Sequence, residues 1–95
     1  MKEDLNQLRA QLDALDDALA ELLGRRARLS LRVGELKRAS GGPVHRPERE
    51  AEILARLGDI IDQKGGPLGR DGLERIYRAI FTVSRQIQEE GQGRG

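Results

Sequence analysis

The first 40 residues place aliphatic side chains at the seven-residue spacing of a coiled-coil helix. With Leu5 at heptad position a, nine of the ten a and d positions from 5 to 36 are Leu or Val. The tenth, an a position, is Arg26. No proline interrupts this segment, and its other residues are mostly good helix formers. The pattern predicts one long helix over about 3–38.

A second helix is indicated after the segment 39–47, which is rich in Gly and Pro. Proline suits the first position of a helix because an amide N–H there would have no partner within the helix. Pro47 stands where the new pattern begins. Aliphatic residues then recur on one face until a Gly-Gly-Pro sequence stops the pattern. These signals predict a helix over about 47–64.

A third helix is indicated by Asp71 with Glu74 three residues later, a spacing related to the capping box. The hydrophobic stripe that follows predicts a helix over about 71–90. The sequence shows no strand pattern and no internal repeat. We therefore predict an all-α fold with three helices, one long and two shorter, in a single domain over 1–95.

The predicted first helix is too long to be buried by its own chain. At 1.5 Å per residue it is about 54 Å long, whereas a compact chain of this size is only ~30 Å across. An apolar seam that runs the whole length of such a helix needs helices from another chain. We therefore predict an obligate oligomer, most simply a two-fold homodimer.

Composition excludes several classes of function. The chain has no cysteine and a single histidine, His45, which we expect to face solvent in the Gly/Pro loop, so neither a disulfide framework nor a Cys/His metal site is expected. A net charge of +1 argues against a general nucleic-acid binder. No apolar run approaches the ~20 residues of a membrane span, and the charged N-terminus is unlike a signal peptide, so we expect a cytoplasmic protein.

The candidate functional residues are polar groups on faces that the periodicity requires to be apolar. Burying such groups costs free energy unless a partner satisfies them. Each also has an ordinary interpretation. An arginine on the seam can fix the register of a coiled coil, and charges beside the seam can simply be solvated. A carboxylate at the start of the second helix can interact with the helix dipole, and polar residues at the end of the third can face solvent. The residues are Arg26 on the seam, Arg9 and Lys37 in the flanking e series, Glu50 at the start of the second stripe, and Ser84 and Gln88 at the end of the third.

Taken together, these groups suit a small ligand with two negative charges and a hydroxyl. The sequence contains no motif that pairs a nucleophile with a general base, and no phosphate-binding loop motif. Any chemistry at such a site must act by positioning and fixed charges.

The order of these residues resembles a known enzyme family. The motifs are LRxxLDALDxxLxxLLxxR at 8–26, VGxxK at 33–37 and PVHRPERE at 43–50, followed by Ser84 and Gln88. They resemble the all-helical AroQ class of chorismate mutases over about 5–88, and RPEREA is similar to the bacterial branch often fused to prephenate dehydratase. The resemblance implies an intertwined dimer that rearranges chorismate to prephenate without a cofactor.

The resemblance also implies roles for the candidate residues. Arg26 and Arg9 would hold the two substrate carboxylates, with Arg9 supplied by the other subunit and Ser84 adding a hydroxyl. Lys37 and Gln88 would donate hydrogen bonds to the ether oxygen, where negative charge develops as its bond breaks.

Three residues of the RPERE motif complete the implied site. Glu50 would accept a hydrogen bond from the ring hydroxyl, and Arg49 would border the substrate. Some members of the family carry an acidic residue beside the substrate hydroxyl at the position of Arg46. In this chain any contact from that position would come from the backbone of Arg46. Two alternatives stay open: an isochorismate pyruvate lyase on the same scaffold, and a non-catalytic regulatory or dimerisation domain.

Overall fold

The computed structural model describes residues 4–42 and 46–93, and His45 therefore lies outside the described residues. Three helices and no strand occur in this part of the chain. The predicted all-α class with one long and two shorter helices is confirmed. The helices are α1 (Leu5–Ser40), α2 (Pro47–Lys64) and α3 (Gly69–Gly93).

The ends of α1 are set by local hydrogen bonds. The backbone N–H of Gln7 donates to Asp4 Oδ1 at 2.8 Å, and the backbone N–H of Asp4 donates to Gln7 Oε1 at 3.1 Å, which makes a capping box. The helix runs two residues past the predicted end, through Ala39 and Ser40. It stops at Gly41, whose φ of 77° is a left-handed conformation that glycine adopts without strain.

The start of α3 differs from the prediction. The helix begins at Gly69, so Asp71 lies inside the first turn and is not the capping residue. The Arg70 guanidinium forms ion pairs with Asp59 at 2.7 Å and Asp62 at 2.8 Å, both on α2. These ion pairs join the first turn of α3 to α2.

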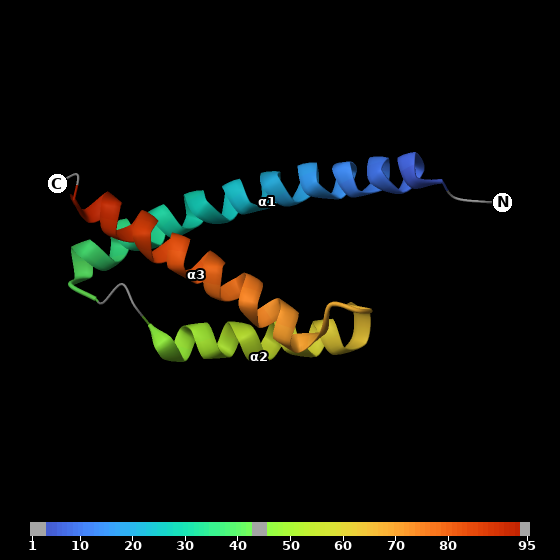
Figure 1. Ribbon diagram of the computed structural model, residues 1–95. Coiled ribbons are helices and arrows are strands. Elements are labelled where there is room, and N and C mark those ends of the chain that lie inside the picture. The colour runs from blue at the N-terminus through green and yellow to red at the C-terminus, as the bar shows by residue number, and fades with distance from the viewer. Residues whose placement is uncertain (1–3, 43–45, 94–95) are drawn as a thin grey trace.

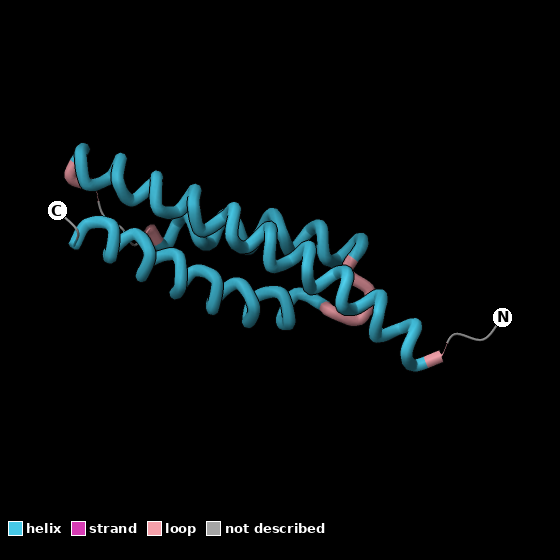
Figure 2. The backbone as a smooth tube through the Cα atoms, turned by 90° about the horizontal axis from the view of Figure 1, so that it is seen from above, coloured by secondary structure: helices cyan, strands magenta, loops and turns pink. Residues whose placement is uncertain are grey.

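Helix α3 packs against both other helices, whereas α1 and α2 do not pack on each other within the described ranges. Figures 1 and 2 show α3 crossing between them. Buried small residues on α1, Ser30 and Gly34, face Ser84 and Gln88 on α3. A Cβ atom at Gly34 would lie 3.0 Å from Gln88 Cα, so any larger residue there would require the two backbones to move apart by a few tenths of an ångström.

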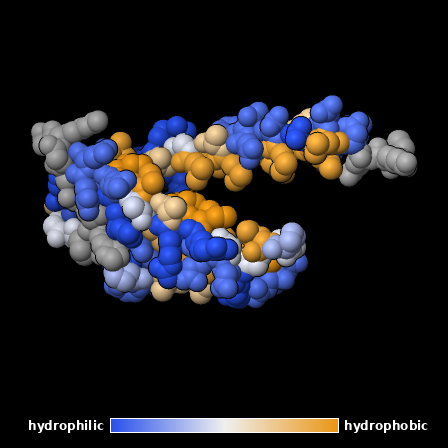
Figure 3. All heavy atoms as spheres, in the orientation of Figure 1, coloured by the Kyte–Doolittle hydropathy of each residue, from blue (hydrophilic) through white to orange (hydrophobic). Residues whose placement is uncertain are grey.

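The apolar seam of α1 is not buried by the chain's own helices. The buried apolar residues of the described chain are Ile53, Leu73 and Phe81, while the seam residues of α1 are 40% to 71% exposed. Figure 3 shows hydrophobic residues of its N-terminal half facing open space. A continuous exposed apolar face of this kind marks an interaction surface. The exposed seam residues are Leu5, Leu8, Leu12, Leu15, Leu19, Leu22, Leu29, Val33 and Leu36.

Candidate active site

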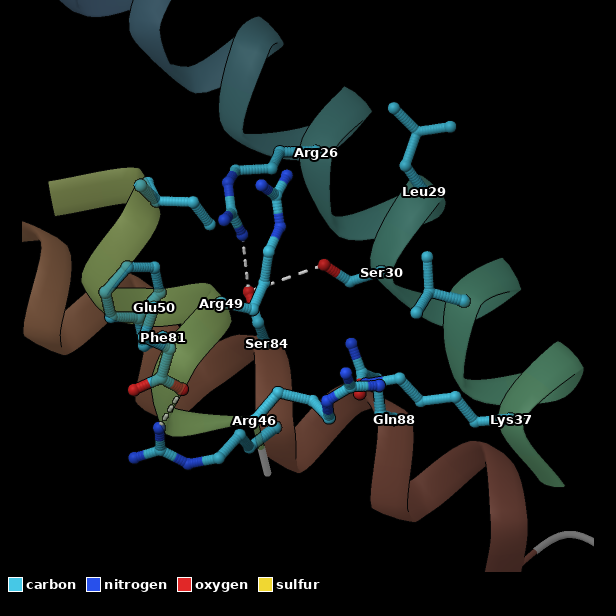
Figure 4. Close-up of a pocket in the computed structure, with 13 residues that line it drawn as sticks. Arg26, Leu29, Ser30, Lys37, Arg46, Arg49, Glu50, Phe81, Ser84 and Gln88 are labelled. Atoms are coloured by element: carbon cyan, nitrogen blue, oxygen red, sulfur yellow. Dashed lines mark hydrogen bonds and ion pairs between the residues drawn. The ribbon is translucent and has the colours of Figure 1, made fainter. Parts of the chain in front are cut away.

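One cavity of about 320 Å³ lies where the C-terminal half of α1, the first turn of α2 and the C-terminal half of α3 meet (Figure 4). Its size is at the lower end of the range for small-molecule sites. Seven of the eight candidate residues line it: Arg26, Lys37, Arg46, Arg49, Glu50, Ser84 and Gln88.

The eighth candidate, Arg9, does not line this cavity. It lies 17 residues before Arg26 on α1, about 26 Å along the helix. One chain therefore does not bring Arg9 to the site, and its participation stays a prediction.

Arg26 is held in the cavity by contacts with α3. Its Nη1 donates to Ser84 Oγ at 2.6 Å, and Ser30 Oγ lies 3.4 Å from the same oxygen. The guanidinium carbon is 5.7 Å from the ring centre of Tyr77 and 6.0 Å from that of Phe81, which are cation–π distances. Within the described chain no carboxylate pairs with Arg26. Its direction is therefore fixed while its charge stays available to an anion.

Lys37 and Gln88 project into the same end of the cavity from α1 and α3 (Figure 4). Burial, and secondarily the nearby charge of Arg46, lower the pKa of Lys37. Gln88 is only 9% exposed, and within the described residues its Oε1 has no hydrogen-bond partner. An amide can turn to present either its oxygen or its NH₂ group there. A buried amide with unused hydrogen-bonding capacity is suited to a bound ligand.

Arg85 is a cavity residue that the sequence analysis missed. Its Nη1 donates to Glu50 Oε2 at 2.5 Å and so joins α3 to the first turn of α2. In the sequence, Arg85 lies on the edge of the predicted stripe, four residues after Phe81 and three before Gln88, a position that a solvated arginine can equally occupy. A carboxylate on an otherwise apolar face also requires a partner.

The cavity is strongly cationic. Five of its lining residues carry positive charge and one carries a carboxylate, while its walls are completed by aliphatic and aromatic side chains. Ser84, the candidate hydroxyl, contacts Arg26 and Ser30, and among residues 4–42 and 46–93 no hydrogen bond joins it to a carboxylate or a histidine. The positive residues are Arg26, Lys37, Arg46, Arg49 and Arg85.

Metal and membrane features are absent from the described part of the chain. No group of three or more His, Cys, Asp or Glu residues is placed there to hold a metal ion. No helix among residues 4–42 and 46–93 has the length and apolar character needed to cross a membrane.

A pocket between helices lined by five cations and one paired carboxylate is suited to a small polyanion. The chain belongs to the chorismate mutase type II family, which it matches over residues 8–89. The resemblance drawn from the sequence motifs is thereby confirmed.

Individual relatives cover most of the chain. A bifunctional chorismate mutase/prephenate dehydratase of Aquifex aeolicus is 34% identical over 89 residues, which are 93% of this chain and 25% of that protein, so the chain spans about a quarter of its length. A 4-amino-4-deoxychorismate mutase of Streptomyces pristinaespiralis is 32% identical over 88 residues, 93% of this chain and 67% of that protein. The crystal structure of chorismate mutase from Helicobacter pylori in complex with prephenate has a TM-score of 0.83 and 35% identity, and covers 94% of this chain and 93% of that one.

Proposed function

We propose that this protein converts chorismate to prephenate by an intramolecular rearrangement. One carbon–oxygen bond breaks and one carbon–carbon bond forms within the same molecule, so no proton acceptor, cofactor or covalent intermediate is required. The observation that carries the proposal is the charge of the cavity, five cations around one carboxylate, which suits a dicarboxylate. Membership of the chorismate mutase type II family supports the same reaction.

The proposed roles follow the position of each side chain. Arg26, held by Ser84, binds a substrate carboxylate and selects the folded conformer in which the reacting ends meet. Lys37 and Gln88 stabilise negative charge on the ether oxygen as its bond breaks. Glu50 accepts a hydrogen bond from the ring hydroxyl.

We further propose that the active form is an intertwined homodimer in the cytoplasm. The occupant of the exposed α1 seam is a second copy of the chain, because the seam continues beyond the reach of α2 and α3 (Figure 1). Arg9 lies about 26 Å before Arg26 along α1, so in the proposed dimer it serves the cavity of the other subunit. In that arrangement Arg9 binds the second substrate carboxylate.

A product assay tests the function directly. The protein is mixed separately with chorismate and with isochorismate, and the products are identified by mass and by chromatography. Prephenate from chorismate supports the proposal. Pyruvate and salicylate from isochorismate alone would identify a lyase, and no product from either substrate would identify a non-catalytic domain.

The charge state of Lys37 predicts the alkaline limit of the reaction. A lysine donates to the ether oxygen best as an ammonium ion, so kcat/KM should fall as pH rises through its lowered pKa. Arg46→Met removes the smaller of the two causes of that lowering. We expect the midpoint of the alkaline fall to move to higher pH. Arg49→Met, which removes a cation outside those causes, should leave the midpoint in place. A downward or absent change in Arg46→Met would contradict the role of Lys37.

The close approach of α1 and α3 at Gly34 predicts that a larger residue there lowers both activity and stability. In Gly34→Ala the new methyl group lies 3.0 Å from Gln88 Cα, so α3 must shift and carry Gln88 with it. We expect kcat to fall about 10–100-fold and the Tm by several degrees, as for an overpacked contact of about 1–3 kcal/mol. Gly24→Ala is the matched control, since its methyl group meets only the flexible end of Arg28 at 3.7 Å. Equal activity in the two variants would show that this contact does not position Gln88.

A further inference from the structure

The ion pair between Arg85 and Glu50 ties α3 to α2 at the cavity. The pair is partly shielded from water, because the two side chains are only 29% and 22% exposed. Arg85 Nη2 also lies 3.5 Å from Thr82 Oγ1, a hydroxyl that donates to the carbonyl of Arg78 at 3.0 Å. The guanidinium is therefore oriented by its own helix as well as by Glu50.

The pair changes what Glu50 offers to a ligand. A carboxylate that holds one guanidinium can accept further hydrogen bonds, since its two oxygens provide about four acceptor positions. Its negative charge, however, is already compensated by Arg85 in a site where water screens charges less than on the open surface. Glu50 therefore acts toward a ligand as an oriented acceptor with little net charge.

This distinction decides which ring substituent the cavity accepts. A hydroxyl is neutral and needs only an acceptor, whereas an alkyl amine is protonated at neutral pH and needs a negative charge that is not already matched. With Arg85 paired to Glu50, and with Arg46 and Arg49 lining the same cavity, an ammonium group would enter positive surroundings.

We infer that Arg85 is a positioning and specificity residue that, through Glu50, selects cyclic dicarboxylate enol ethers with a ring hydroxyl over those with a ring amine. The inference rests on the proposed function, in which Glu50 faces that ring substituent. It assigns to this chain a preference opposite to that named for the Streptomyces pristinaespiralis relative, a 4-amino-4-deoxychorismate mutase.

A purely structural role for Arg85 makes a different prediction. If the pair only ties α2 to α3, its loss lowers stability and reduces turnover of both substrates by the same factor. If the pair sets the charge beside the substrate, its loss changes the ratio of the two kcat/KM values. That ratio is therefore the readout.

The test measures kcat/KM for chorismate and for 4-amino-4-deoxychorismate in wild type, Arg85→Met and Arg85→Lys. We expect wild type to prefer chorismate, Arg85→Met to lose at least about tenfold of that preference, and Arg85→Lys to retain most of it. Arg78→Met is the matched control, because Arg78 pairs with Glu74 on the same helix at 66% and 43% exposure, away from the cavity. This control should keep the wild-type ratio.

A second variant covers the case in which Arg85→Met fails to fold. Glu50→Gln leaves Arg85 uncompensated beside the substituent, so the preference for chorismate should rise at least several-fold although turnover falls. The inference is overturned by a wild-type preference for the amine, or by an unchanged ratio of the two kcat/KM values in Arg85→Met or in Glu50→Gln. Either result leaves the mutase activity standing. No turnover of either substrate by wild type overturns the proposed function and the inference with it.

Discussion

Arg26→Leu should abolish activity and leave the protein as stable as wild type or more stable. Arg26 enters the cavity with its charge unmatched by any carboxylate of the described chain, and one such contact to a substrate carboxylate is worth about 3–4 kcal/mol in the transition state. Loss of that contact lowers kcat/KM by about 150- to 900-fold.

The stability of Arg26→Leu is set by opposing effects of similar size. The variant loses the hydrogen bond to Ser84, about 1.5–3 kcal/mol, and cation–π contacts with Tyr77 and Phe81 of about 0.5–1 kcal/mol each. It gains about 1.5–3 kcal/mol from a leucine buried on the apolar seam of the proposed dimer, and it no longer buries an uncompensated charge. We therefore expect a Tm within a few degrees of wild type or above it.

Arg25→Leu is the matched control, because it removes an exposed guanidinium one residue away that does not line the cavity. It should retain activity. Thermal unfolding and kcat/KM for chorismate are measured for both variants. A Tm that falls markedly in Arg26→Leu alone, with activity lost in proportion to unfolding, would make Arg26 a structural residue and contradict its proposed role.

The helices could be predicted because the signals for them are local. Heptad spacing, Pro47 and the Gly/Pro segments each act within a turn or two of the chain. The start of α3 lies at Gly69, two residues before the predicted start at Asp71. In this first turn Arg70 pairs with Asp59 and Asp62 of α2. Such a contact depends on how helices pack and leaves no spacing rule in the sequence.

The cavity was predictable for a related reason. Arg26, Glu50 and Gln88 interrupt apolar stripes, and stripes of packed helices converge, so polar interruptions meet in one place. Arg85 was missed because an arginine at the edge of a stripe has the same sequence pattern as a solvated one. Only the position of Glu50, 35 residues earlier in the chain, distinguishes the two cases.

Mixing two inactive variants should restore activity. Arg9 and Lys37 lie 28 residues apart on α1, about 42 Å along the helix, so one small substrate cannot touch both in the same chain. In the proposed dimer each site takes Lys37 from one chain and Arg9 from the other. Arg9→Ala and Lys37→Ala homodimers are therefore each inactive. Their heterodimer contains one intact site and one site that lacks both residues.

The size of the recovery is set by the statistics of subunit exchange. After unfolding and refolding an equal mixture, half of the dimers are mixed and each carries one working site, so activity should return to about a quarter of the wild-type value. A mixture of Arg26→Leu with Lys37→Ala is the matched control. Both residues line the cavity of the same chain, so neither site of that heterodimer is complete and no recovery is expected. Heterodimer formation is verified in both mixtures by native mass spectrometry with one partner isotope-labelled. Heterodimers that form without recovery in the first mixture, or recovery of equal size in the second, would show that the two subunits do not share their sites as proposed.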